Sequence, residues 1–193
     1  LSDYEGHESG VATVGFVLRD PLGNDFPVVY QGVADSSDSR DMASTLDDLL
    51  ARRGEAFKNI EVLRSEYGGD IVLHFRSLEY AASRCGLAPV GGYGAEGDFS
   101  DPSERRYAAA VLAIDCPLDI VVAHEVGHLM GLTHSLREDG EGGTFDFATG
   151  YGVENQFTTI MALPAAFGMA TQAGVFSSPN LACGDSRCGI AER

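Results

Sequence analysis

Basic residues are scarce in this chain of 193 residues. It has 13 Lys and Arg against 29 Asp and Glu, which gives a formal net charge of −16 at pH 7. A field of this sign repels the phosphate backbone of nucleic acids and the surface of anionic membranes. We therefore expect neither nucleic acid nor a membrane surface as a partner.

Long apolar runs and a leader segment are also missing. The longest wholly apolar run covers only residues 108–114, whereas a membrane-spanning helix needs about 20 such residues. The chain begins at Leu1 without an initiating Met and without a basic and apolar leader. That start is typical of a mature or trimmed form, from which any export signal and propeptide have been removed.

Cysteines are few, and none stand in the CxxC spacing of a zinc knuckle. The four are Cys85, Cys116, Cys183 and Cys188. An even number allows two disulfides in an exported protein, but four buried thiols in a cytosolic protein fit the count equally well. The cysteine count alone leaves both possibilities open.

The rest of the composition is that of an ordinary folded protein, with 44% hydrophobic and 22% charged residues. These fractions exclude extensive disorder. The length is close to the prior of roughly 150 residues per domain, and no repeat or low-complexity linker divides the chain. We expect one domain covering residues 1–193.

The first part of the chain predicts two strands, a helix and a third strand. Residues 11–18 and 26–33 are β-rich runs separated by a cluster of turn formers, which indicates two strands. Between Leu46 and Tyr67, apolar residues recur at spacings of three, four and seven. This pattern predicts one long amphipathic helix. Residues 70–75, which are mostly apolar, follow it as a buried strand.

The middle of the chain predicts a loop, a strand and a second helix. Residues 86–104 are rich in Gly, Pro and acidic side chains, which favours a long surface loop. Residues 107–114 form a further strand candidate. Asp119 is a candidate N-cap for a helix that runs to Met130 and ends at Gly131. Beyond the end of this helix the periodicity fades into Gly-rich loops.

One motif on this second helix carries the functional argument. Residues 124–134, HEVGHLMGLTH, fit the pattern HExxHxxGxxH at every fixed position. His124 and His128 are four residues apart, so a helix presents both imidazoles on one face to a single ion. Gly131 can adopt positive φ, which ends the helix and brings His134 back as a third ligand.

The chemistry of this motif is that of a catalytic zinc site. Three neutral imidazoles leave one open position on a tetrahedral zinc ion, whereas structural sites are closed by four protein ligands. Glu125 lies beside the histidines and can hold and deprotonate a water molecule at the metal. Histidines that merely pack in a core helix would require neither Glu125 nor Gly131.

The motif resembles that of the metzincin superfamily of zinc endopeptidases, whose second hallmark is a Met-containing turn below the metal. Met161, in Thr159-Ile160-Met161-Ala162, is similar to that Met-turn. Residues 59–70 look like the backing helix and first strand of bacterial reprolysin-like peptidases. Segments 85–88, 115–116 and 176–180 are similar to bacterial metzincins of the peptidyl-Asp metallopeptidase type.

The resemblance implies an α+β fold, the zincin-like catalytic domain. A twisted mixed sheet, a backing helix and the zinc helix would form an upper subdomain, residues 1–134. A loop-rich lower subdomain, residues 135–193, would carry Met161. The strand at residues 107–114 would then lie nearest the cleft and pair with an extended protein or peptide substrate.

The implied activity is hydrolysis of peptide bonds, with zinc held by His124, His128 and His134 and with Glu125 as the general base. Two alternatives stay open: a secreted zinc-binding module without protease activity, and a zinc hydrolase of non-peptide amides. The presence of Glu125 argues against the first, and a strand at the cleft edge argues against the second.

Two positions depart from relatives within the superfamily. Ser135 follows the third histidine, where reprolysins have Asp and matrixins have Ser. Leu163 stands where astacins and serralysins have a Tyr that ligates zinc, so that extra ligand is expected to be absent. The subfamily is not fixed by these residues.

A secreted peptidase lives in an oxidising compartment, where thiols that can reach each other pair. With the resemblance, this predicts the disulfides Cys85–Cys116 and Cys183–Cys188. We accordingly expect a secreted, extracellular protein, and we expect it to be a monomer.

Other polar residues have plainer interpretations. His74 lies in an apolar strand and is expected to be a hydrogen-bonded core histidine. Acidic clusters could supply oxygen ligands to calcium, but they match no EF-hand spacing, so solvated loops are expected instead. These clusters are Asp98, Asp101 and Glu104, and Glu138, Asp139 and Glu141. Tyr151 could either line the cleft or pack.

Overall fold

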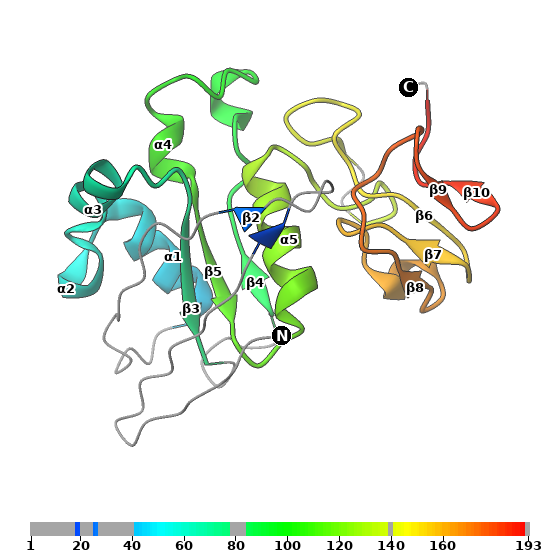
Figure 1. Cartoon of the computed structure of the whole chain (residues 1–193), viewed down its shortest axis with the longest axis horizontal. Coiled ribbons are helices and arrows are strands. Elements are labelled where there is room, and N and C mark those ends of the chain that lie inside the picture. The colour runs from blue at the N-terminus through cyan, green and yellow to red at the C-terminus, as the bar shows by residue number, and fades with distance from the viewer. Residues whose placement is uncertain (1–17, 20–24, 27–40, 78–83, 139–140, 192–193) are drawn as a thin grey trace.

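A mixed three-stranded sheet stands at the centre of the larger part of the molecule (Figure 1). The computed structural model describes residues 18–19, 25–26, 41–77, 84–138 and 141–191. Strand β3 (Val72–Arg76) pairs in parallel with β5 (Ala109–Ala113), and β4 (Gly86–Leu87) pairs antiparallel with the other side of β5. With its helices, this sheet gives the mixed α+β fold that the sequence predicts.

Two predictions about this sheet are wrong: the position of the segment 107–114 nearest the cleft, and the long loop at residues 86–104. All five residues of β5 are buried, and the strand order is β3-β5-β4. The segment 107–114 therefore contributes the central strand, and β3 and β4 stand at the two edges of the sheet. In addition, the expected loop 86–104 contains β4 and the short helix η2 (Tyr93–Ala95) and ends where α4 (Glu104–Tyr107) begins.

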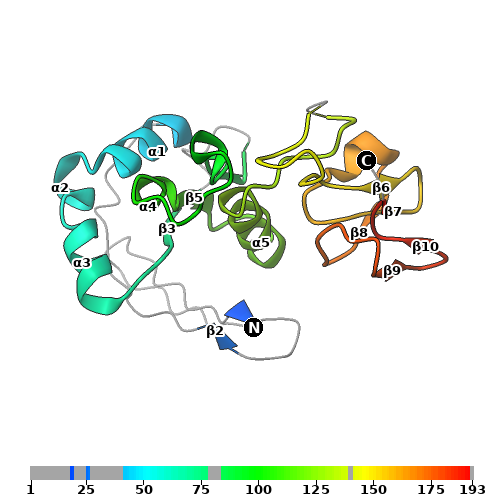
Figure 2. The ribbon, with the colours of Figure 1, turned by 90° about the horizontal axis from the view of Figure 1, so that it is seen from above.

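Side chains of β5 point alternately to two apolar cores, as the period of two in a strand requires. Ala109, Val111 and Ala113 pack with buried residues from three helices, α1 (Met42–Ala51), α2 (Gly54–Phe57) and α3 (Ile60–Tyr67). Ala110 and Leu112 pack with Val122 and Leu129 of α5 (Leu118–Leu129). The two groups of helices accordingly lie on opposite sides of the sheet (Figure 2). The apolar run in the sequence thus forms a strand buried on both faces.

The prediction of a single long helix between residues 46 and 67 is wrong. The structure has three helices here: α1 (Met42–Ala51), α2 (Gly54–Phe57) and α3 (Ile60–Tyr67). Arg52 and Gly54 have φ values of 57° and 76°, in the left-handed region, which no helix interior tolerates. The apolar periodicity survives the break because all three helices bury residues against the same face of the sheet.

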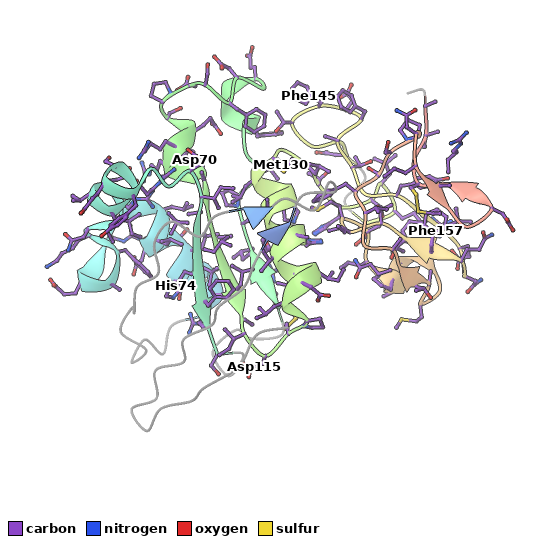
Figure 3. All side chains as sticks on the ribbon, viewed as in Figure 1. Asp70, His74, Asp115, Met130, Phe145 and Phe157 are labelled. Atoms are coloured by element: carbon purple, nitrogen blue, oxygen red, sulfur yellow. A yellow bond between two sulfur atoms is a disulfide. The ribbon has the colours of Figure 1, made fainter. Side chains whose placement is uncertain are left out.

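Helix α5 (Leu118–Leu129) is the helix that carries the HExxH residues. It starts two residues earlier than expected: Pro117 is the N-cap, and Asp119 lies in the first turn, where its charge suits the positive end of the helix dipole. Figure 3 shows Asp115 before the start of the helix and Met130 at its other end.

Short strands and turns make up the part of the chain beyond α5, on the side away from α1 to α3 (Figures 1 and 2). A three-stranded sheet has the order β6-β7-β8, and β9 pairs with β10. Their bounds are β6 Gly152–Val153, β7 Phe157–Thr158, η3 Pro164–Phe167, β8 Thr171–Gln172, β9 Ala182–Cys183 and β10 Ser186–Arg187. Buried Phe167 and Ala170 form a small core here with Ala162.

Two disulfides are present, Cys85–Cys116 and Cys183–Cys188. They are the two pairs that the sequence analysis expects. The first joins residues 31 apart in the chain and ties the start of β4 to the turn before α5. On the chain-entropy model, a loop of that size contributes roughly 3–4 kcal/mol to stability.

The two N-terminal strand predictions fall mostly on residues outside the described part of the chain. What is described are β1 (Leu18–Arg19) and β2 (Asp25–Phe26), which pair antiparallel. Of the helices in the described ranges, none is both long enough and apolar enough to span a membrane.

Candidate metal centre

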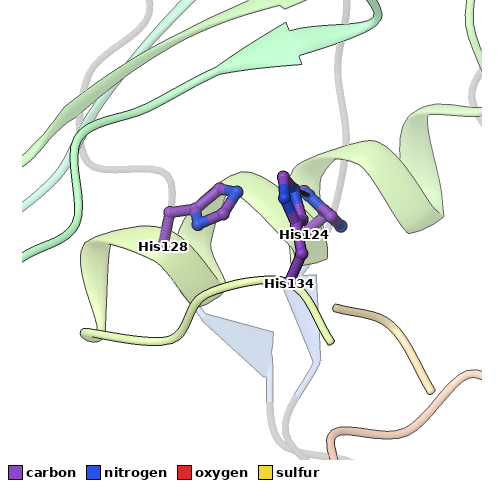
Figure 4. A group of neighbouring side chains, drawn as sticks. All are labelled: His124, His128 and His134. Carbon is purple, nitrogen blue, oxygen red and sulfur yellow. Dashed lines mark hydrogen bonds between the residues drawn. The ribbon is translucent and has the colours of Figure 1, made fainter. Parts of the chain in front are cut away.

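Three imidazoles from the motif come together at one point (Figure 4). His124 and His128 project from α5, and His134 comes from the segment that follows the helix. Their candidate ligand nitrogens all lie within 4.8 Å of one another. Within the described ranges, this is the group of His, Cys, Asp or Glu side chains that could hold a metal ion.

Backbone carbonyls fix two of the rings. The Nδ1 atom of His124 lies 2.9 Å from the Ile160 carbonyl oxygen, and Nδ1 of His128 lies 2.9 Å from that of Leu132. A carbonyl only accepts hydrogen bonds, so each Nδ1 carries the proton and each Nε2 keeps a lone pair.

The spacing of the His124 and His134 nitrogens fits zinc. Two nitrogens about 2.0–2.1 Å from a tetrahedral zinc are separated by roughly 3.3 Å. The Nε2 atoms of His124 and His134 are 3.1 Å apart. Three neutral imidazoles are also the donor set of known catalytic zinc sites.

The turn after α5 is made by Gly131. Its φ of 90° is one that side chains rarely tolerate. Its N–H donates to the His128 carbonyl at 2.8 Å, and the N–H of Leu132 donates to the Gly127 carbonyl at 3.0 Å. These two bonds end the helix and reverse the chain within a few residues, which brings His134 back beside the helical pair.

Glu125 is buried against β4, an edge strand of the sheet. It is 5% exposed, and its Oε2 atom has no hydrogen-bond partner among the described residues. Burial raises the pKa of its carboxyl to about 8, and the positive charge of a bound zinc ion would favour the carboxylate form. A buried carboxylate oxygen without a partner costs stability, and such atoms are characteristic of functional sites.

The close packing of Glu125 depends on Gly86 in β4. A Cβ atom at position 86 would lie 2.3 Å from Glu125 Oε1. Only glycine therefore lets the strand pass so close to the carboxylate. Nothing in the sequence indicates this requirement, because the contact joins residues far apart in the chain.

Met161 lies directly under α5. The Ala162 N–H donates to the Thr159 carbonyl at 3.0 Å, which closes a tight turn around Met161. The Met161 side chain is fully buried, and a Cβ atom at Gly127 would lie 2.4 Å from its sulfur. The sulfur thus packs against the backbone of the helix between His124 and His128.

A sequence model of metallo-peptidase family M12B, reprolysin-like, matches residues 28–193. The chain belongs to this family. The peptidyl-Asp metalloendopeptidase of Pseudomonas aeruginosa is 32% identical to it over 149 residues, which make up 69% of the chain and 25% of that protein. This reprolysin-like chain therefore spans about a quarter of the length of the curated relative.

A solved structure supports the fold of the reprolysin-like chain. A chain in the structure described as "Structure of a chaperone-substrate complex" superposes with a TM-score of 0.52 at 19% identity. The match covers 81% of the reprolysin-like chain and 22% of the other.

Membership of a metallopeptidase family, together with the three imidazoles, assigns zinc as the cofactor.

Several other residues near the metal centre have roles that the sequence does not indicate. Gln172 donates through Nε2 to the Ile160 carbonyl at 3.1 Å, the same oxygen that holds His124. The sequence analysis expects Glu138 to be solvated, but its carboxylate accepts hydrogen bonds from Ser135 and Leu163. Leu163, whose side chain has no atom that could ligate zinc, is 48% exposed.

Two other residues weighed in the sequence analysis pack against aromatic rings. The Tyr151 ring lies 6.1 Å from that of Phe157, and its backbone N–H donates to Thr159. His74 stands edge-on to Phe57, with 5.1 Å between ring centroids. His74 therefore belongs to the β3 side of the molecule and not to the metal centre.

Met161→Ala is expected to lower the free energy of unfolding by about 2–5 kcal/mol, because it leaves a cavity under α5. Chemical denaturation of the zinc-loaded protein measures this loss. Met169→Ala is the control, since Met169 is 77% exposed and surface changes stay within about 0.5 kcal/mol. Equal stability of Met161→Ala and the parent protein would contradict the packing described.

Proposed function

We propose that this chain is the catalytic domain of a zinc endopeptidase of the metzincin type. His124, His128 and His134 hold the ion, and Glu125 is the general base. The observation that carries the proposal is one helix that presents two imidazoles of the metal group and, between them, a buried carboxylate with an unpartnered oxygen. A site that held zinc only for structure would have no use for that carboxylate.

Glu125 performs the proton transfers in this proposal. Zinc, when bound, supplies Lewis acidity that polarises the scissile carbonyl and makes water acidic enough to lose a proton near neutral pH. The Glu125 carboxylate takes the proton from the attacking water and passes it to the nitrogen of the leaving amine. The carbon–nitrogen bond breaks, and water supplies the hydroxyl and the proton of the two products.

Strand β4 offers a place for the substrate. It is an edge strand in the order β3-β5-β4, and Gly86 of this strand lies against Glu125. An extended peptide that pairs with the edge of β4 by main-chain hydrogen bonds would therefore run past the general base. This arrangement favours a polypeptide substrate over a small amide.

Gly86→Ala is expected to lower kcat by about 100-fold, because the added Cβ displaces the Glu125 carboxylate and misplaced catalytic groups lose roughly that much rate. Zinc content should not change, since Gly86 supplies none of the three candidate ligands. Steady-state kinetics and metal analysis measure both quantities.

Gly94→Ala is the matched control for Gly86→Ala. A Cβ at position 94 meets no atom within 4 Å, so its kcat should equal that of the parent. An unchanged kcat in Gly86→Ala would show that β4 does not set the position of Glu125.

Cleavage-site profiling on a proteome-derived peptide mixture tests the proposed function, with and without a zinc chelator. We expect new peptide termini that disappear with the chelator. An enrichment of aspartate beside the cleaved bonds would extend to this chain the preference in the relative's name. Zinc binding without any cleavage would favour a binding module, and hydrolysis of small amides alone would favour the amidase alternative.

The cellular setting is part of the same proposal. Every cysteine of the chain is in a disulfide, and disulfides persist in oxidising compartments. This supports an extracellular protein. We place the boundary between an upper and a lower subdomain at residues 134 and 135, where the motif ends.

A further inference from the structure

A carboxylate connects the segment after the third histidine to the turn that contains Met161. Glu138 Oε2 accepts a hydrogen bond from the Ser135 hydroxyl at 2.5 Å and from the Ser135 N–H at 3.3 Å. The Leu163 N–H donates to both Glu138 oxygens, at 3.2 and 3.3 Å. One side chain thus joins two backbone segments that are 25 residues apart in sequence.

Each end of this connection lies next to the metal centre. Ser135 directly follows His134, and it is only 2% exposed. Leu163 stands two residues after Met161, which is fully buried under α5. The connection therefore runs from a residue adjoining the third imidazole to the exit of the turn beneath the helix.

The first imidazole is fixed to the same turn from the other side. Nδ1 of His124 donates to the carbonyl of Ile160, which immediately precedes Met161. His124 is thus held to the entry of the turn, and the His134 segment is held to its exit through Glu138. The two imidazoles, whose Nε2 atoms are 3.1 Å apart, share one anchor.

We propose that Glu138 is a positioning residue for zinc, which acts through Ser135 to hold His134 at the distance from His124 that the ion requires. The inference rests on the zinc site of the proposed function. Polar groups that orient metal ligands commonly change metal affinity or activity by about 10- to 100-fold when they are replaced. A carboxylate is suited to this position because three donors converge on its two oxygens and it has no hydrogen to offer.

Glu138→Gln is expected to raise the dissociation constant for zinc by about 10- to 100-fold. Its carboxamide presents an NH₂ group to N–H or O–H donors, so at least one bond is lost. Competition with a chelating dye measures the zinc affinity. The visible absorption of the cobalt-substituted protein should also change, because this spectrum depends on the arrangement of the metal ligands. A general loss of stability does not change that arrangement in the folded protein.

Glu154→Gln is the matched control. Glu154 is paired with Arg137, the neighbour of Glu138, and Arg137 also donates to the Ala166 carbonyl at 3.2 Å. The control therefore makes the same chemical change and loosens the same segment without touching Ser135. It should keep the zinc affinity and the cobalt spectrum of the parent. A loss equal to that of Glu138→Gln would overturn the proposal.

Ser135→Ala keeps the test decisive if Glu138→Gln does not fold. It removes the hydroxyl donor but leaves the Glu138 carboxylate and its bonds to Leu163. We expect weaker zinc binding in Ser135→Ala too. Where Glu138→Gln folds, the variant that carries both substitutions should lose less free energy of zinc binding than the sum of the two single losses, because both residues act through one connection. Zinc affinities and cobalt spectra like those of the parent in the folded variants would overturn the proposal.

These measurements do not depend on peptide cleavage. A parent protein that binds zinc and cleaves nothing would overturn the proposed function, whereas the role of Glu138 would still be decided by the zinc affinities.

Discussion

Glu125→Gln should lower kcat for peptide cleavage by about 10²- to 10⁴-fold, the range that a general base contributes. The carboxamide cannot accept the proton of the attacking water, yet it has nearly the same shape as the carboxylate. Zinc binding should persist, because the three imidazoles are unchanged. Steady-state kinetics and metal analysis on the same preparation separate the two effects.

Glu66→Gln is the control for this variant. Glu66 is exposed on α3, on the far side of the sheet from α5, so its kcat should equal that of the parent. If Glu125→Gln retained more than a tenth of the parental kcat with zinc bound, Glu125 would not be the general base.

His128→Ala should abolish stoichiometric zinc binding. The variant keeps only two imidazoles, and His128 is a buried ligand candidate whose ring is held by the Leu132 carbonyl. After dialysis, bound zinc should fall from one ion to below about 0.1 ion per chain, since a preformed set of ligands is what retains the metal. Atomic absorption or mass spectrometry of the native protein measures the content.

The matched control is His74→Ala, which removes a histidine of β3 that packs on Phe57 of α2, on the opposite side of the sheet from α5. It should lose stability but retain one zinc ion per chain. A full zinc ion in His128→Ala would remove His128 from the proposed ligands.

The site was predictable from the sequence where its geometry is local. A spacing of four residues places His124 and His128 on one helical face in any α-helix. A glycine that adopts positive φ can end the helix and return the chain. The grouping of the three imidazoles follows from these two facts, without knowledge of the rest of the fold.

The parts that the sequence did not indicate depend on contacts between distant segments. The apolar periodicity predicts the burial of Leu46, Leu49, Phe57 and Ile60, but Tyr67 at its end is 44% exposed. The periodicity also cannot reveal breaks, since Arg52 and Gly54 leave the buried face unchanged. The two residues of β4 are too short a run to signal a strand. Glu138 lies among acidic neighbours, and its bond to Leu163 arises only when the chain folds back.

A zinc titration of peptide cleavage tests the central claim most directly. Protein that has been freed of metal is mixed with increasing zinc, and cleavage of a quenched fluorescent peptide is followed. We predict no cleavage without metal, then a linear rise up to one zinc ion per chain and no further increase. Cleavage by the zinc-free protein, or a failure of stoichiometric zinc to produce any cleavage, would contradict the account.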